Sequence, residues 1–234
     1  MSRQFYEKDA RTYDEDRWET SAGRYINMTQ KEIVLQKAKW HGKKVLEIGA
    51  GTGRFSIEVG RQGGTVFALD LAFSMLTTIR AKSNNQSDIK LLQANAENLP
   101  FQSDAFDICI CINTFSHMPS CDVVMNEVHR VLKQDGLFIF NFPNLFSVYF
   151  PFGLIVNIKK RSLRKGVYTR WYKPREFTRA YRRNCFKLQN TQGEVHFPTR
   201  TANFIVPILS FLDKAFRKSI LKYVSPVIFY TLRK

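Results

Sequence analysis

The sequence predicts an α/β protein built on a doubly wound sheet of mostly parallel strands. Short apolar runs alternate with segments of helical periodicity through residues 1–144, which is the pattern of strands joined by crossover helices. A glycine-rich turn directly follows the first apolar run, where sheets of this kind bind their ligands. We therefore expect helices on both faces of the sheet and a ligand at the carboxyl ends of the strands.

Each strand is expected at a short apolar run bounded by turn residues or polar positions. The runs are 43–49, 64–70, 89–95, 106–113 and 136–142. Helical segments precede or separate them at 29–40, 54–62, 74–81 and 123–132. The last segment has one apolar face, and we expect its Glu127 and Arg130 to pair at the helix surface.

The regular alternation ends after residue 142. Residues 137–158 contain no charge, but Pro143, Pro151 and Gly153 argue against a membrane-spanning helix. We expect an N-terminal unit at 1–42 that lies over the ligand, a core at 43–144, and a basic, aromatic substrate cap with the final strands at 145–234. The stretch that ends the sequence, VSPVIFYTLRK, is expected to supply the last strand.

The charge is unevenly placed. Residues 1–144 carry 17 basic and 17 acidic side chains, so the whole net charge of +16 comes from residues 145–234. The back half therefore either faces an anionic partner or forms a solvated basic surface.

The cysteines and the N-terminus bear on compartment and metal binding. The four cysteines have no CxxC spacing, and no His or Cys cluster has the spacing of metal ligands. The charged N-terminus lacks the apolar core of a signal peptide. We expect a reduced, cytoplasmic protein without a metal site.

The glycine-rich turn reads GAGTG. Asp70 ends the next strand 19 residues after Gly51, where a carboxylate can accept hydrogen bonds from both hydroxyls of a ribose. Arg54 stands where a dinucleotide fingerprint needs glycine or alanine, and no phosphate-loop string GxxxxGK[ST] occurs. Glu47, ahead of the turn, would repel a pyrophosphate but suits a cationic ligand. These features favour an adenosyl ligand.

Together these stretches resemble class I S-adenosylmethionine-dependent methyltransferases. Glu47 with the glycine turn resembles the first motif, and ALDLAFSML resembles the second. ANAENLPFQSDAFDICICINTFSHMP and NEVHRVLKQDGLFIFNFPN are similar to later motifs, in the expected order across residues 43–144. The branch resembled is that of the small-molecule, ubiquinone/menaquinone-like (type 11) enzymes. The resemblance implies a Rossmann-like fold with an antiparallel last strand, and S-adenosylmethionine as cofactor.

The resemblance also implies which residues contact the cofactor. Asp70 holds the ribose, Leu71 and Met75 lie near the adenine, and Ala96 offers its backbone N–H to the adenine ring. Asn95 stands where the family usually has Asp, and its amide oxygen can still accept from the adenine amino group. The other expected cofactor contacts are Tyr13, Glu47, Gly49, Ala50, Gly51, Gly53 and Asn113.

The implied reaction moves a methyl group from a sulfonium to a nucleophile by in-line displacement, in which orientation alone can supply about 7–11 kcal/mol. A hydroxyl acceptor also needs a base. His117, just after the fourth strand, is the candidate base, with a purely structural role in its loop as the alternative. Tyr6 and Tyr13 are candidates for a flap over the cofactor, with core packing as the alternative.

The acceptor is open among several classes. We favour O- or C-methylation of a small-molecule or lipid-type acceptor, with residues 145–165 lying peripherally on an anionic membrane. YTRWYKPREFTRAYRR suits an RNA backbone instead, and Arg170, Lys173 or Arg175 suit a soluble acceptor that carries phosphate or carboxylate. A non-catalytic protein that binds S-adenosylmethionine is the remaining alternative.

Overall fold

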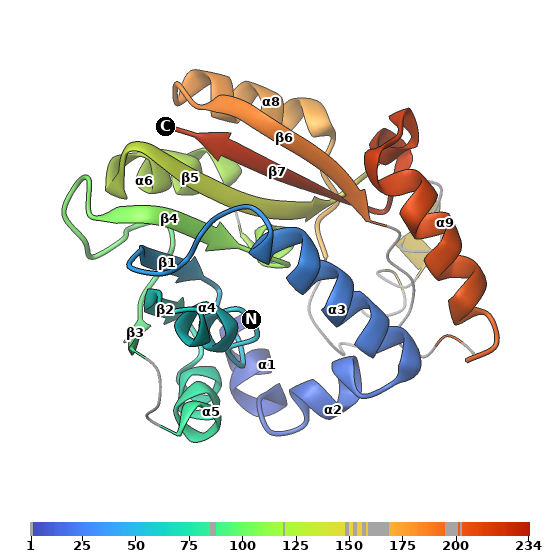
Figure 1. The fold of residues 1–234 in the computed structure, drawn as a ribbon, viewed down its shortest axis with the longest axis horizontal. Helices are drawn as coiled ribbons and strands as arrows, with labels where there is room; N and C mark the ends of the chain where they lie inside the picture. Colours follow the sequence, from blue (N-terminus) through green and yellow to red (C-terminus); the bar gives the residue numbers. More distant parts are fainter. Residues whose placement is uncertain are drawn as a thin grey trace.

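Seven strands form one mixed sheet in the order β3-β2-β1-β4-β5-β7-β6 (Figure 1). The structure is a computed structural model, and it describes residues 2–84, 88–118, 120–147, 150–151, 154–155, 158, 169–194, 201 and 203–234. The strands are β1 (Lys44–Ile48), β2 (Thr65–Asp70), β3 (Ile89–Gln93), β4 (Phe106–Cys111), β5 (Leu132–Pro143), β6 (Lys187–Glu194) and β7 (Val227–Arg233).

Strands β1 to β5 pair in parallel, and β7 runs antiparallel to both β5 and β6. The predicted sheet, mostly parallel with an antiparallel last strand, is therefore confirmed. The strand order changes direction between β1 and β4, because β2 and β3 lie on one side of β1 and β4 to β7 on the other. In open α/β sheets such a switch point leaves a crevice at the carboxyl ends of the strands.

Helices cover both faces of this sheet (Figure 1). Apolar residues of α3 and α4 pack with Val45, Ile110 and Phe229 on one face, while α6 and α8 pack on the other. The helices are α1 (Ser2–Asp9), α2 (Tyr13–Trp18), α3 (Ser21–Leu35), α4 (Ser56–Arg61), α5 (Phe73–Ser83), α6 (Cys121–Val131), α8 (Pro174–Arg183) and α9 (Val206–Lys218), with 3₁₀ turns η1 (Phe115–His117) and η2 (Ile220–Val224). The doubly wound architecture follows the predicted one.

Helix α3 differs from the helix expected at 29–40. It begins at Ser21, because the Thr20 side chain accepts a hydrogen bond from the Gly23 N–H at 3.0 Å and so caps the helix. It ends at Leu35, whose carbonyl accepts from the Trp40 indole at 2.9 Å. The buried Trp40 therefore follows the helix and does not extend it.

An aromatic layer joins the two halves of the chain. Phe138, Phe140 and Phe142 alternate along β5 and face α8, where the Phe177 ring stacks on Phe142 at 4.2 Å between centroids. The back half thus contributes core helices and strands as well as surface. The boundaries at 42 and 144 stay a prediction, and most of 145–165 lies outside the described residues.

Strand β6 was not among the expected strands. Its sequence, KLQNTQGE, is polar and its first four residues are exposed, as suits an edge strand paired on one side only. Nowhere in the described part of the chain is there a helix with the length and apolar character that crossing a bilayer requires.

Glu127 and Arg130 do more than pair on the surface of α6, which corrects the expectation for them. Arg130 donates to the carbonyls of Leu99 at 2.9 Å and Phe101 at 2.6 Å, and Glu127 accepts from the Leu99 N–H at 2.7 Å. The two side chains also form an ion pair at 2.7 Å. The pair therefore fixes the loop that follows β3.

Candidate active site

A pocket opens at the carboxyl ends of β1, β2, β3 and β4. Its empty space, open mouth included, is about 1050 Å³. Residues 49–52, 70–72, 94–97 and 112–114 line it, each following a different strand. The switch point of the sheet thus carries the candidate site.

The three glycines of the GAGTG turn have different structural roles. Gly49 has φ +70°, and a Cβ added there would overlap the side chain of Thr114, so this position requires glycine for packing. Gly51 has φ +53° but open space where its Cβ would be, on a turn that lines the pocket. Gly53 does not line the pocket and packs on Ile79, so it shapes the turn instead of meeting the ligand directly.

Asp70 connects two turns at this edge. Its Oδ2 accepts from the Gly51 N–H at 2.8 Å, and its Oδ1 accepts from the Ala72 N–H at 2.9 Å. Burial raises the pKa of the Asp70 carboxyl above its ordinary value, and these backbone hydrogen bonds oppose that rise. Each carboxylate oxygen can accept a second hydrogen bond, so Asp70 can receive two ribose hydroxyls without releasing either turn.

The expected adenine side is apolar with a polar edge. Leu71 and Met75 line the pocket with the buried Ala96. Asn95 lies beside them, and its amide oxygen accepts from the Glu97 N–H at 3.1 Å. One lone pair of that oxygen stays available for an amino group.

Glu47 lies at the base of the pocket and is only 3% exposed. The Ser56 hydroxyl donates to its carboxylate. The pKa of Glu47 is raised to about 7. Burial is the main cause, and the hydrogen bond from Ser56 opposes the rise. A cation bound nearby would favour the ionised form.

Asn113 lines the pocket, but its amide side chain is engaged away from it. The Asn113 Nδ2 donates to Gln30 Oε1 at 3.0 Å, and its Oδ1 accepts from Asn141 at 2.9 Å. Gln30, fully buried on α3, also accepts from Arg54 at 3.0 Å and donates to Glu194 at 2.9 Å. Gln30 therefore ties the loops after β1 and β4 to β6.

The N-terminal helices form one wall of the pocket, through Arg3, Tyr6 and Tyr13. Glu7 of α1 accepts hydrogen bonds from the Phe73 N–H at 2.9 Å and from the N–H and hydroxyl of Ser74 at 2.8 and 2.6 Å. It thereby caps α5, in the manner of an acidic side chain at a helix N-terminus.

Helix α2 is attached to the glycine turn. The Thr52 hydroxyl donates to Asp14 at 2.6 Å, and Lys82 pairs with the same carboxylate. The Arg17 guanidinium lies 4.0 Å from the centroid of the Tyr13 ring, so one face of Tyr13 is already occupied by a cation of the protein itself.

His117 and Tyr6 meet at the pocket. The Tyr6 hydroxyl lies 2.9 Å from His117 Nε2, and their rings make an edge contact at 5.6 Å between centroids. Burial raises the pKa of Tyr6 above its ordinary value, so this hydroxyl stays protonated near neutral pH and can donate to Nε2.

The structure thus brings the expected cofactor contacts, apart from Gly53, to one pocket together with Tyr6 and His117. Reasoning from the sequence missed Glu7 and Gln30. Glu7 binds Phe73, 66 residues away, and Gln30 binds Arg54, Asn113 and Glu194, which are 24, 83 and 164 residues away. No local signal marks such contacts. Within the described residues, no three His, Cys, Asp or Glu side chains gather as metal ligands.

Comparison with known proteins identifies a domain within the chain. Residues 46–140 match the family described as "Methyltransferase domain". Over 95% of its length the chain is 29% identical to an uncharacterized protein of Methanocaldococcus jannaschii, of which it covers 88%.

Two named relatives are each 34% identical over part of the chain. The ubiquinone/menaquinone biosynthesis C-methyltransferase of Allorhizobium ampelinum matches over 56% of this chain and 54% of its own length. The malonyl-[acyl-carrier protein] O-methyltransferase of Hamiltonella defensa matches over 48% and 44%. The chain spans about half the length of these two relatives.

Solved structures share the fold. A SAM-dependent methyltransferase of Thermotoga maritima has a TM-score of 0.74 over 100% of both chains, at 16% identity. The magnesium protoporphyrin IX methyltransferase of Synechocystis, solved with bound SAH, has a TM-score of 0.62 over 91% of this chain and 84% of its own, at 13% identity.

Residues 46–140 form a methyltransferase domain on this sheet, and the protein is an S-adenosylmethionine-dependent methyltransferase. The cofactor of such a domain is S-adenosylmethionine. The residues present fit that group: Asp70 has spare acceptor capacity, Gly51 leaves open space, and the Glu47 carboxyl would ionise beside a cation.

Replacing Asp70 by alanine is expected to weaken S-adenosylmethionine binding at least about 100-fold, because two charge-assisted hydrogen bonds of roughly 1.5–3 kcal/mol each are lost. Isothermal titration calorimetry measures the affinity, and circular dichroism checks the fold. Asp88→Ala is the matched control, since this exposed carboxylate accepts from Thr65 just ahead of β3. Undiminished binding by a folded Asp70→Ala protein would contradict the placement of the ribose.

Helix α1 is expected to loosen in acid. Its Glu7 has a pKa lowered from 4.5 to about 2, chiefly by the Ser74 hydroxyl. A depressed carboxyl pKa means that the contribution to docking is complete above pH 4.5 and is lost as the pH falls towards 2. Hydrogen–deuterium exchange of α1, corrected for intrinsic rates, should therefore be faster at about pH 3 than at about pH 6.

Glu7→Gln should show fast exchange in α1 already at the higher pH, whereas Glu15→Gln, at an exposed position of α2, should behave as the unchanged protein. Equal protection of α1 in all three proteins at both pH values would rule out Glu7 as the anchor.

Proposed function

We propose that the protein transfers the methyl group of S-adenosylmethionine to an oxygen or carbon of a small-molecule or lipid-type acceptor. The observation that carries this proposal is a single pocket lined both by the cofactor-binding edge around Asp70 and by the Tyr6–His117 pair. When bound, S-adenosylmethionine supplies an electrophilic methyl group on a sulfonium and leaves as a neutral thioether.

The residues divide the work of binding. Asp70 holds the ribose hydroxyls, and the loop at 94–97, fixed by Arg130 and Glu127, receives the adenine. Glu47 supplies negative charge for the cationic end of the cofactor. Helix α1 closes the wall nearest to His117 and so excludes water from the reacting atoms.

Proton transfer is assigned to Tyr6 and His117. In the His117 tautomer whose Nε2 carries no proton, the Tyr6 hydroxyl donates to Nε2, so an acceptor hydroxyl can pass its proton to the Tyr6 oxygen while the Tyr6 proton moves to Nε2. The acceptor oxygen then forms the new bond to the methyl carbon. The pair thus needs no ionised tyrosine in the resting enzyme.

The acceptor class is supported by the names of the relatives, which act in quinone biosynthesis and on malonyl-[acyl-carrier protein]. The basic residues that the sequence suggested for an anionic acceptor, Arg170, Lys173 and Arg175, do not line the pocket. Arg170 pairs with Glu176 at 3.1 Å and lies 4.6 Å from the Tyr172 ring centroid. These contacts favour a structural role for Arg170.

Methyl transfer is expected to label small molecules or lipids. The purified protein is incubated with methyl-labelled S-adenosylmethionine and, separately, with lipid, soluble small-molecule and RNA fractions of a cell extract, with the Asp70→Ala protein as control. Label in the lipid or small-molecule fraction supports the proposal. Label in RNA alone would favour the RNA-directed alternative, and cofactor binding without transfer to any fraction would favour a non-catalytic protein.

His117→Gln is expected to lower kcat by about 100-fold or more, because general base catalysis is lost. Tyr6→Phe should lower kcat in the same direction while cofactor affinity changes less. His129→Gln, on α6 and in contact with Phe186, is the matched control. If the His117→Gln protein methylates a hydroxyl acceptor with unchanged kcat, His117 has only a structural role.

A further inference from the structure

Helix α9 turns two polar side chains, Asp213 and Arg217, inward and two large apolar side chains, Ile208 and Phe211, outward. Asp213 has a fully buried side chain and that of Arg217 is 11% exposed, whereas Ile208 is 62% and Phe211 73% exposed. A helix on a water-soluble protein ordinarily turns its apolar stripe to the core. The outer face of α9 is therefore the unusual feature of this part of the fold.

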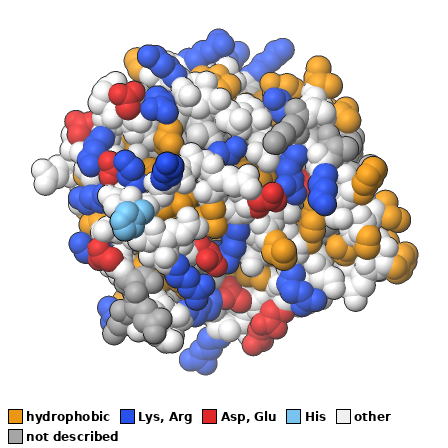
Figure 2. Space-filling view, viewed as in Figure 1, with side chains coloured by type: hydrophobic (Ala, Val, Ile, Leu, Met, Phe, Trp, Pro, Cys, Tyr) orange, Lys and Arg blue, Asp and Glu red, His pale blue; other side chains and the backbone are white. Residues whose placement is uncertain are grey.

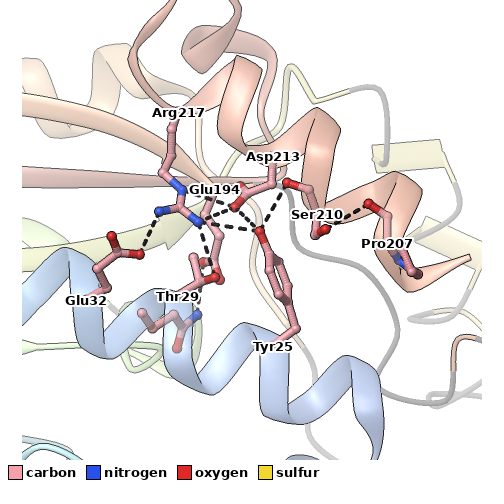
Figure 3. Close-up of polar contacts among 9 residues, drawn as sticks. Tyr25, Thr29, Glu32, Glu194, Pro207, Ser210, Asp213 and Arg217 are labelled. Carbon is pink, nitrogen blue, oxygen red and sulfur yellow. Dashed lines mark hydrogen bonds and ion pairs between the residues drawn. The ribbon is translucent and has the colours of Figure 1, made fainter. Parts of the chain in front are cut away.

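Contacts with α3 hold the helix in this orientation (Figure 3). The Tyr25 hydroxyl donates to Asp213 at 2.8 Å, and Arg217 donates to Asp213 at 2.6 Å and to Glu32 at 2.9 Å. Rotating α9 to bury Ile208 and Phe211 would separate the Asp213 carboxylate from Tyr25 and the Arg217 guanidinium from Glu32. The outward position of Ile208 and Phe211 is thus fixed by these polar contacts.

The exposed apolar residues continue beyond the helix. Further apolar residues are exposed just before and just after α9. Together with the two within the helix we name them the α9 face: Phe204, Ile208, Phe211, Ile220, Leu221 and Tyr223, with exposed fractions of 78, 62, 73, 81, 43 and 49%. Figure 2 shows hydrophobic side chains gathered at the right edge of the molecule, where α9 lies in Figure 1. Exposed apolar side chains gathered in one region in this way are typical of an interaction site.

The charge of the same region indicates the occupant. All of the net charge of +16 comes from residues 145–234, and Lys214 is exposed one turn after Phe211. Apolar residues beside cations are the composition of a segment that lies in the headgroup layer of an anionic membrane. A second copy of the chain would bring like charges together, which opposes self-association.

The length of the helix agrees with this occupant. Thirteen residues span about 20 Å, too short to cross a bilayer but sufficient to lie along its surface. Three apolar residues of the segment expected to meet a membrane are exposed as well: Leu154, Ile155 and Ile158 are 44, 63 and 60% exposed.

We propose that the α9 face docks the protein peripherally on an anionic lipid bilayer, with Ile208 and Phe211 inserted among the headgroups. This docking is independent of methyl transfer. It would place the protein at a surface where apolar acceptors are concentrated.

The test is co-sedimentation of the full chain with vesicles of phosphatidylcholine alone or mixed with anionic phosphatidylglycerol, at low and high salt. We expect binding to the anionic vesicles that salt reduces but does not abolish. Ile208→Ser together with Phe211→Ser should weaken it by about 100-fold, because two large apolar side chains no longer leave water. Lys214→Glu should weaken it by about tenfold.

The matched control replaces two exposed apolar residues elsewhere, Met28→Ser with Val123→Ser, which are 71 and 44% exposed on α3 and α6. It should bind as the unchanged protein, and thermal melts should show that all variants are folded. Failure to bind either vesicle, or equal loss in the control and the α9 variant, would overturn the proposal. A dimer in sedimentation velocity that the α9 variant abolishes, without vesicle binding, would assign the face to a second copy.

Discussion

The site depends on the Asp70 carboxylate, which accepts backbone N–H groups from Gly51 and Ala72. These hydrogen bonds join the turn after β1 to the turn after β2, so a single side chain sets the spacing of the two turns that border the switch point. The turns cannot move independently while both bonds persist. Since the same oxygens retain acceptor capacity for a ribose, the group that shapes the empty pocket is also the group that meets the cofactor.

The other walls are held by contacts that converge on this edge from distant parts of the chain. Glu7 docks α1 on the start of α5, and Gln30 joins the loops after β1 and β4 to Glu194 at the end of β6. Arg130 fixes the loop after β3 from the side of α6. Side chains from β2, α1, α3 and α6 therefore hold the walls of the pocket together, and each does so through hydrogen bonds as well as apolar packing.

The sequence predicted what is local and missed what is distant. The glycine turn and Asp70 are separated by one strand–helix step with a characteristic spacing, so both could be placed without coordinates. The same holds for the apolar runs of β1 to β5. Strand β6 was missed because an edge strand needs no apolar alternation, and Glu127 with Arg130 looked like an ordinary helix pair because their carbonyl and amide partners lie about 30 residues away. The inward position of Asp213 on α9 depends on Tyr25, which periodicity alone cannot identify.

Burial of Glu47 has a consequence for the energetics of folding. Its pKa is raised from 4.5 to about 7, so the folded, ligand-free protein holds a proton there that the unfolded chain releases. The stability of the ligand-free protein therefore falls as the pH rises from 4.5 towards 7. A cationic ligand beside Glu47 reverses this by favouring the carboxylate, and its binding expels the proton. Proton release and cofactor uptake are in this way two sides of one equilibrium, and the apparent enthalpy of binding includes the ionisation of the buffer that takes up the proton.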